Sequence, residues 1–176
     1  MLAVNLPSNL YLHKHIMSTQ IDVEIICKST LGAELEESEC AVLGAIMDIR
    51  QLKDGEYLVK EGETDSALCL LASGKLVVIS NIDNAETDVY VMRAGECAGT
   101  RSFIDHAPRR ATLKAKGDST IYNLDPHRFE ALLKTQPLVV YKVMRALFRI
   151  THANLMRMNV ETRELSNYIH KTGGRY

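Results

Sequence analysis

One segment in the middle of the chain has the residue types needed to hold a small anion. It contains Gly99, then residues 100–104, which fit a short helix, and then Arg109 at the entry to an expected strand. A glycine before a helix start leaves backbone N–H groups and a partial positive charge facing outward. An arginine guanidinium offers a planar fork of donors that matches two phosphate oxygens. The segment therefore indicates a phosphate site, although Arg109 would equally suit an ion pair with a surface acid.

The residues around this segment have the pattern of short strands. Between residues 49 and 124, apolar runs such as LVVIS and TDVYVM alternate with turn residues, among them Asp54-Gly55 and Ser73-Gly74. Asp-Gly and Ser-Gly pairs supply the backbone conformations that tight turns need. The spacing predicts an antiparallel sandwich or barrel, which would position the anion-binding loop between two strands.

Helical patterns lie on both sides of the expected strands. Residues 35–47 fit a helix that Ser38 or the acids before it would cap, whereas residues 21–27 fit a strand or a short helix equally well. Asp125 and Pro126 predict the start of a short helix over residues 127–135. Its expected inward side chains are Phe129, Leu132 and Leu133.

A long helix is expected from Pro137 to about His170. Its apolar side chains recur mostly every three or four residues, which is the spacing of one helix face. A helix of this length exceeds what one small barrel can cover. We therefore expect part of its apolar face to pack on a second copy of the chain. Packing within one chain is the alternative.

Three motifs in the correct order resemble the cyclic nucleotide-binding domain, the β-roll of the catabolite activator protein and of the protein kinase A regulatory subunit. Residues 54–63 resemble the family's first glycine pair, and residues 70–76 its Ser-Gly turn. Residues 99–108 match the phosphate-binding cassette in length, and Pro108-Arg109-Arg110-Ala111-Thr112 resembles its ending. The resemblance runs from about Leu31 to Asn159.

The resemblance implies a mainly β fold with flanking helices: an antiparallel, jelly-roll-like β-roll, then a short helix and a long C-terminal helix. It divides the chain into an N-terminal arm (1–30), the β-roll with its flanking helices (31–136), and the long helix with a short tail (137–176). It also implies a ligand such as cyclic AMP or cyclic GMP, with no certain cofactor and no metal. The ligand-binding residues expected on this basis are Gly99, Thr100, Arg101, Ser102, Arg109, Arg110, Ala111, Thr112 and, from the long helix, Asn154. Thr151 is the other candidate from that helix.

The binding chemistry of the family carries over only in part. Arg109 stands at the arginine that pairs with the cyclic phosphate, and Gly99 at the cassette glycine. Thr100 stands where the family usually has a glutamate that accepts a hydrogen bond from the ribose 2′-hydroxyl, and Arg101 replaces an apolar residue. Loss of a charged hydrogen bond costs about 1.5–3 kcal/mol, or roughly ten- to a hundredfold in affinity. Two interpretations follow: a pocket that still binds a phosphate ligand, or a ligand-free interaction module.

The remaining sequence features argue against two classes of function, catalysis and sequence-specific DNA binding. No Ser/His/Asp or Cys/His spacing predicts a nucleophile, so we expect no enzyme. Six residues follow His170, which leaves no room for a recognition helix, so sequence-specific DNA binding is not expected. In bacterial relatives of this family the long helix leads to such a domain. We expect a stand-alone sensor that signals through an unknown protein partner or through its own dimer.

Charge and cysteine usage complete the picture. The 176 residues carry a net charge of −1, and no apolar run is long enough to span a membrane. Residues 31–65 carry a net charge of −7 and residues 142–176 a net charge of +5. These segments fit two solvated faces, or a basic helix that docks on an acidic partner or on the N-terminal part of the same chain. The four cysteines form no C-x-x-C pair, so we expect free thiols and a cytoplasmic location.

Overall fold

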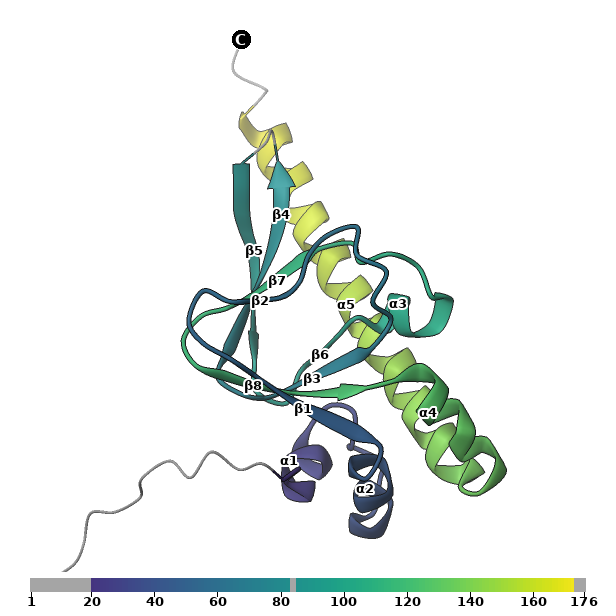
Figure 1. Ribbon diagram of the computed structural model, residues 1–176. Coiled ribbons are helices and arrows are strands. Elements are labelled where there is room, and N and C mark those ends of the chain that lie inside the picture. Colours follow the sequence, from purple (N-terminus) through teal and green to yellow (C-terminus); the bar gives the residue numbers. More distant parts are fainter. Residues whose placement is uncertain (1–19, 83–84, 173–176) are drawn as a thin grey trace, which may run out of the picture.

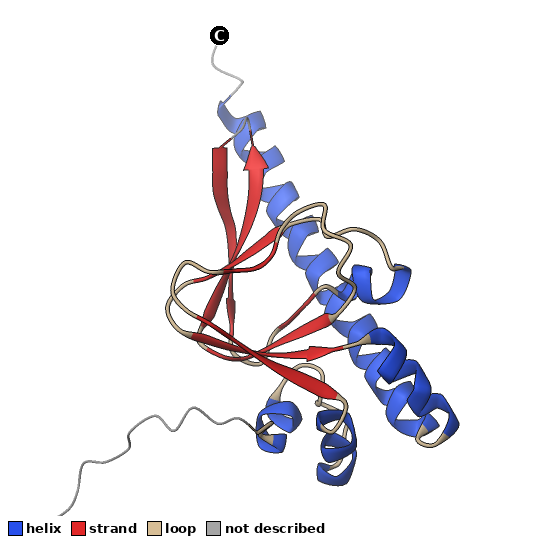
Figure 2. Ribbon diagram, viewed as in Figure 1, coloured by secondary structure: helices blue, strands red, loops and turns tan. Residues whose placement is uncertain are grey.

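The computed structural model describes residues 20–82 and 85–172 and contains two antiparallel sheets with helices on their outer side (Figures 1 and 2). Residues 1–19, most of the predicted N-terminal arm, lie outside the described part. The strands are β1 (Met47–Leu52), β2 (Tyr57–Val59), β3 (Leu68–Ser73), β4 (Lys75–Ile82), β5 (Ala85–Arg93), β6 (Cys97–Ala98), β7 (Thr112–Ala115) and β8 (Ser119–Leu124). The helices are α1 (Val23–Lys28), α2 (Glu37–Gly44), α3 (Thr100–Asp105), α4 (Pro126–Ala131), the 3₁₀ turn η1 (Leu132–Lys134) and α5 (Pro137–Thr172).

The strands form two four-stranded sheets. One has the order β1-β8-β3-β6 and the other the order β2-β7-β4-β5, and every neighbouring pair is antiparallel. The strand and turn signals in the sequence thus correspond to real strands, and the predicted antiparallel β architecture with flanking helices is confirmed.

The first sheet separates two hydrophobic cores because β3 is buried on both faces. Leu68 and Leu70 point to the outer core, which the sheet shares with the helices. Cys69 and Leu71 point to the inner core between the two sheets. Alternate residues of a strand face opposite sides, so a continuous apolar run is what a strand buried on both sides requires.

The predicted helices of the C-terminal part are present. The Asp125 side chain accepts a hydrogen bond from the Arg128 amide at 3.0 Å and caps α4. Phe129 is buried, but Leu133 is 56% exposed, so its predicted inward position is wrong. The reason is that the chain tightens into η1 at Leu132, which changes the period from 3.6 to 3.0 residues per turn and turns Leu133 outward.

Helix α5 is a single long helix that crosses one side of the sheets (Figure 1). Val139, Val143 and Leu147 in its first part are buried in the outer core. Its later apolar side chains are exposed in the single chain: Leu155, Met156, Met158, Val160, Leu165, Tyr168 and Ile169. Among the described helices, none combines the length and apolarity required to cross a membrane.

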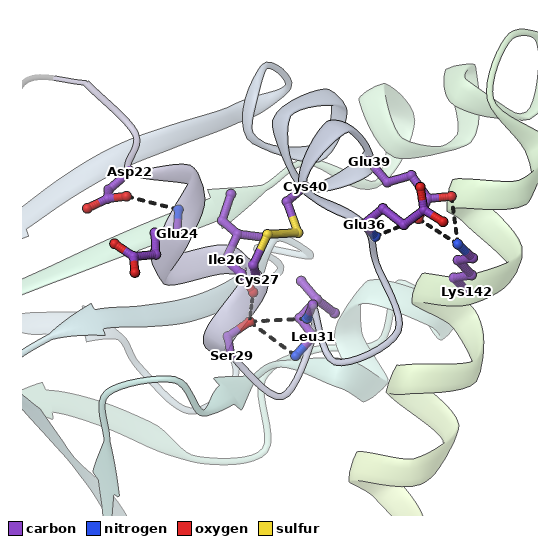
Figure 3. Close-up of a disulfide and its surroundings, with 11 residues drawn as sticks. Asp22, Glu24, Ile26, Cys27, Ser29, Leu31, Glu36, Glu39, Cys40 and Lys142 are labelled. Atoms are coloured by element: carbon purple, nitrogen blue, oxygen red, sulfur yellow. Dashed lines mark hydrogen bonds and ion pairs between the residues drawn. A yellow bond between two sulfur atoms is a disulfide. The ribbon is translucent and has the colours of Figure 1, made fainter.

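The N-terminal helices correct the prediction of free thiols. Residues 21–27, which fitted a strand or a helix, overlap α1, and Cys27 of this helix forms a disulfide with Cys40 of α2 (Figure 3). The two Cα atoms lie 5.8 Å apart, within the usual range for disulfides. The sequence could not reveal this pair, because it depends on how α1 and α2 pack together. Cys69 and Cys97 are free.

The acidic and basic segments of the chain meet in the structure. Lys142 of α5 donates hydrogen bonds to the Glu39 carboxylate at 2.6 and 2.8 Å, and both side chains are largely buried. Glu34 pairs with Arg145 and with Arg149 of the same helix. Part of the basic helix therefore docks on the N-terminal part of its own chain, as one of the two interpretations of the charge pattern predicts.

Candidate phosphate-binding site

A cavity of about 480 Å³ lies between the second sheet, α3 and the middle of α5. This volume falls in the range of small-molecule sites. The sheet contributes mostly apolar side chains, whereas the loop around α3 and the segment 109–111 contribute polar groups. The lining residues are Thr30, Val59, Val78, Tyr90, Met92, Glu96, Cys97, Ala98, Gly99, Thr100, Arg101, Ser102, Arg109, Arg110, Ala111, Leu113, Ile150, Ala153, Asn154 and Arg157.

Arg109 is the central charged group of the cavity. Its backbone is fixed because its amide donates to the Glu63 carbonyl at 2.8 Å and its carbonyl accepts from the Gly62 amide at 2.9 Å. Its side chain is only 3% exposed, and Nη2 donates to the Asp65 carboxylate at 2.9 Å and to the Ala67 carbonyl at 2.7 Å. The acid partner considered from the sequence is thus present, but it occupies only one edge of the guanidinium.

Two other nitrogens of the Arg109 guanidinium are unsatisfied. Nε and Nη1 are buried and have no hydrogen-bond partner among the described residues. A buried donor without an acceptor costs about 1–3 kcal/mol, and more when it is charged. A phosphate oxygen is an acceptor that such a charged donor can bond. The cavity therefore holds a preformed half-site for an anion.

Gly99 lies directly against this guanidinium. It has a left-handed backbone conformation, with φ of 85°, and a Cβ added there would lie 2.1 Å from Nη1 of Arg109. Only glycine permits both the conformation and the contact. Gly99 also ends the extended segment and begins α3, since its carbonyl accepts from the Phe103 amide at 2.9 Å. The short helix predicted over residues 100–104 is therefore present, beside the arginine.

Asp65 keeps the Arg109 side chain in place. Burial favours the neutral form of the Asp65 carboxyl, but the Ala67 amide and the Arg109 guanidinium favour the charged form more strongly. The pKa of Asp65 therefore lies below its ordinary value. At neutral pH the pair is fully charged, and the guanidinium is aimed at the cavity before any ligand arrives.

The first turn of α3 contributes three of the predicted residues. Thr100, Arg101 and Ser102 all line the cavity. The Ser102 side chain is buried, whereas Arg101 is exposed and lies 3.8 Å from Asp105, one turn further along the helix. Thr100 occupies this wall with a hydroxyl, a weaker acceptor than a carboxylate.

One face of α5 forms the opposite wall. It presents Ile150, Ala153, Asn154 and Arg157, which recur at helical spacing. The predicted residue Asn154 therefore lines the cavity. Thr151 is not among the lining residues, and its hydroxyl donates to the Leu147 carbonyl at 2.9 Å instead.

Arg157 also ties α5 to the sheet. Its guanidinium lies 4.1 Å from the centre of the Tyr90 ring, a cation–π contact. The Tyr90 hydroxyl donates to the Glu96 carboxylate at 2.8 Å, which in turn accepts from the Arg93 amide. This chain of contacts joins α5, β5 and the start of the α3 loop along one side of the cavity.

The segment after Arg109 reaches the cavity at two of the three positions expected to bind ligand. Arg110 and Ala111 line the cavity, but Thr112 does not. Thr112 is buried, and its hydroxyl accepts a hydrogen bond from the Glu61 amide at 3.1 Å. This bond fixes the β2–β3 loop, and the Thr112 side chain does not face the cavity. Alternation along the entering strand explains the difference, since Thr112 and Ala111 point to opposite sides.

Two free cysteines lie near the site. Burial raises the pKa of the Cys97 thiol to about 12 and that of the Cys69 thiol to about 11. Both are therefore protonated at neutral pH and poor nucleophiles. Among the described residues, no group of three or more His, Cys, Asp or Glu side chains is arranged to hold a metal ion.

Comparison with known proteins identifies a family and several relatives. A family model described as the cyclic nucleotide-binding domain matches residues 49–136. The cAMP-dependent protein kinase regulatory subunit of Emericella nidulans is 29% identical over 103 residues, which cover 58% of this chain and 24% of that protein. This chain thus matches about a quarter of that relative's length.

Solved structures extend the likeness to the fold. A cyclic nucleotide-binding domain from Methylobacillus flagellatus has a TM-score of 0.69 and 25% identity, with 77% of this chain and 76% of that chain covered. The catabolite activator protein of Thermus thermophilus has a TM-score of 0.66 and 26% identity, with 78% and 63% covered. The β-roll fold expected from the sequence is confirmed.

Proposed function

Because the chain belongs to the cyclic nucleotide-binding domain family, we propose that its cavity binds a cyclic nucleotide or a related phosphate ligand. The observation that carries this proposal is the pair of unsatisfied donors on Arg109. Its buried Nε and Nη1 lack acceptors among the described residues, and Gly99 permits the close approach of the backbone to Nη1. A bound phosphate would supply an acceptor for such donors.

Thr100 sets the expected strength of binding. A carboxylate at this position would add a charged hydrogen bond to a ribose hydroxyl, which the threonine replaces with a weaker one. We therefore expect an affinity roughly ten- to a hundredfold below that of a cavity with glutamate there. The same substitution supports the second candidate, a ligand-free interaction module on the same fold.

We infer that the signal leaves the cavity through the helices. Phe103 of α3 packs on Phe129 of α4, with ring centres 5.4 Å apart, and α4 leads through η1 into α5. A ligand that draws α3 toward Arg109 would move Phe103 and, through Phe129, the start of α5. Such a shift requires that the ligand binds the two arrangements with different affinity.

The exposed half of α5 is the proposed output surface. Phe148 is 74% exposed and Leu155 is 53% exposed, a high exposure for large apolar side chains in a single chain. We propose that this face packs on a second copy of α5, and that the role of the chain is regulatory binding rather than catalysis. A cytoplasmic location, an additional protein partner and the absence of sequence-specific DNA binding remain predictions.

Isothermal calorimetry with cyclic AMP and cyclic GMP tests the ligand. Wild type should release or absorb heat with at least one of them, and Arg109→Ala should abolish the signal. Arg128→Ala is the matched control, since Arg128 is an exposed arginine paired with Asp48 outside the cavity. Circular dichroism verifies that each variant is folded.

The results separate the two candidate functions. No heat from folded wild type with either nucleotide would refute cyclic AMP and cyclic GMP as ligands. Sedimentation of the same sample then tests the interaction module, which predicts a dimer without ligand. A monomer that binds neither nucleotide would contradict the interaction module and would leave a different phosphate ligand as the remaining candidate.

A further inference from the structure

The Cys27–Cys40 disulfide closes a loop that touches both the cavity and α5. Cys27 belongs to α1 and Cys40 to α2, so residues 28–39 lie within the covalent ring; we call them the ring segment (Figure 3). Cys40 is fully buried and Cys27 is half-buried. Cys27 is therefore the more exposed of the two cysteines.

At one point the ring segment forms part of the cavity wall. Thr30 lines the cavity, and both its amide and its hydroxyl bond to the Gly95 carbonyl at 2.9 Å. The Thr30 hydroxyl also lies 3.8 Å from the Cys97 sulfur, which lines the cavity as well. Thr30 thus contacts the turn at Gly95 and strand β6, which lead to Gly99.

At a second point the ring segment holds α5. Glu39 is bonded to Lys142, and Glu34 is paired with Arg145 and Arg149. Arg149 immediately precedes Ile150, the first residue of α5 that lines the cavity. The ring segment therefore holds residues 142–149 of α5, and the following turns of this helix form one wall of the cavity.

We propose that the Cys27–Cys40 pair is a redox-modification site whose state sets the ligand affinity of the cavity. The disulfide restricts the ring segment to the arrangement in which Thr30, Glu34 and Glu39 make these contacts. Reduction removes that restriction, so the ring segment can adopt more conformations. Forming the same contacts then costs more conformational entropy. The reduced protein then holds α5 and the cavity wall less firmly, and it binds ligand more weakly.

The chemistry is thiol–disulfide exchange with a dithiol or disulfide partner. In reduction, a thiolate of the dithiol attacks the Cys27 sulfur, the Cys27–Cys40 bond breaks, and the Cys40 thiolate leaves and takes a proton. The second thiol of the reductant displaces Cys27, so two protein thiols and one reductant disulfide result. Oxidation by a small disulfide is the reverse exchange. In a reducing compartment, disulfides of this kind are usually transient and redox-sensing.

Hydrogen exchange of the full chain tests the coupling without any ligand. The oxidised protein should protect amides in residues 28–39 and 142–153, and dithiothreitol should speed their exchange while amides in β3 and β8 stay unchanged. Intact mass before and after treatment verifies that the disulfide has opened. Unchanged exchange in α5 after complete reduction would overturn the proposal, and so would four free thiols after treatment with oxidised glutathione.

Calorimetry tests the effect on affinity, which rests on the proposed function. Reduction should weaken nucleotide binding by roughly fivefold or more. Cys27→Ser with Cys40→Ser should bind like reduced wild type in both conditions. This variant keeps Cys69 and Cys97, so a redox response that survives in it would assign the effect to another thiol and refute the proposal. If no nucleotide binds, the exchange experiment still decides whether the pair controls α5.

Discussion

Gly99→Ala gives the most direct test of how the phosphate site is built. The added Cβ would lie 2.1 Å from Nη1 of Arg109, and an ordinary contact needs about 3.4 Å. The guanidinium must therefore shift by more than an ångström, which would break its bonds to Asp65 and Ala67. Charged hydrogen bonds contribute about 1.5–3 kcal/mol each. The left-handed backbone adds about 1–2 kcal/mol for any residue other than glycine.

Gly117→Ala separates these two costs. Gly117 has nearly the same backbone angle, with φ of 81°, but a Cβ there would meet no atom within 4 Å. It should lose only the backbone contribution, whereas Gly99→Ala should lose about 3–6 kcal/mol more, or roughly 6–24 °C in Tm. Denaturant unfolding measures both variants. Phosphate-ligand affinity should fall at least about tenfold in Gly99→Ala alone.

Equal losses in the two alanine variants would refute this reasoning. They would mean that Arg109 tolerates a methyl group beside it, and hence that its guanidinium is not fixed against the backbone at Gly99. The unsatisfied donors of Arg109 would then not be held in place for an anion.

Three further predictions address the ligand, the ion pair between Lys142 and Glu39, and the exposed face of α5. Thr100→Glu should raise the affinity for cyclic nucleotides about tenfold or more in calorimetry, and an unchanged affinity would place the ribose elsewhere. Lys142→Met should destabilise the fold by about 1–2 kcal/mol at neutral pH. Lys142 lowers the pKa of the Glu39 carboxyl, so this contribution is present above the ordinary pKa of the carboxyl and is lost as the pH falls through the lowered value. The gap between variant and wild type should therefore narrow in denaturant titrations as the pH falls below the ordinary pKa of the carboxyl, and a constant gap would contradict the ion pair. Phe148→Glu should leave the unfolding free energy within about 0.5 kcal/mol of wild type but weaken self-association in sedimentation, because Phe148 is 74% exposed in the single chain.

Local sequence signals predicted the elements that depend on local chemistry. Turn pairs such as Ser73-Gly74 marked strand ends, and Asp125 marked the start of α4, because these residues act through their own backbone. Arg109 was found for a similar reason: the motif at residues 108–112 is short, and Gly99 lies ten residues before Arg109. These features need no knowledge of the rest of the fold.

Residues brought to the cavity by tertiary packing were missed. Tyr90 and Glu96 line it from β5 and the following turn, and Thr30 comes from the end of α1. Nothing local distinguishes them from other polar residues. Arg157 was within reach of sequence reasoning, since it lies three residues after Asn154 and therefore on the same helix face. The Cys27–Cys40 pair likewise depends on packing between two helices whose contact the sequence does not reveal.

The division of the interior by β3 has a consequence for motion. The helices rest on one face of the first sheet and the inner core fills the other, so the two cores share a wall but no side chains. A shift of the buried first part of α5 therefore needs no repacking between the sheets. The amides of the first sheet can remain protected from hydrogen exchange while the helical layer opens as a separate cooperative unit. A rigid half of the molecule can thus carry Arg109 at a fixed position while the other half moves relative to it.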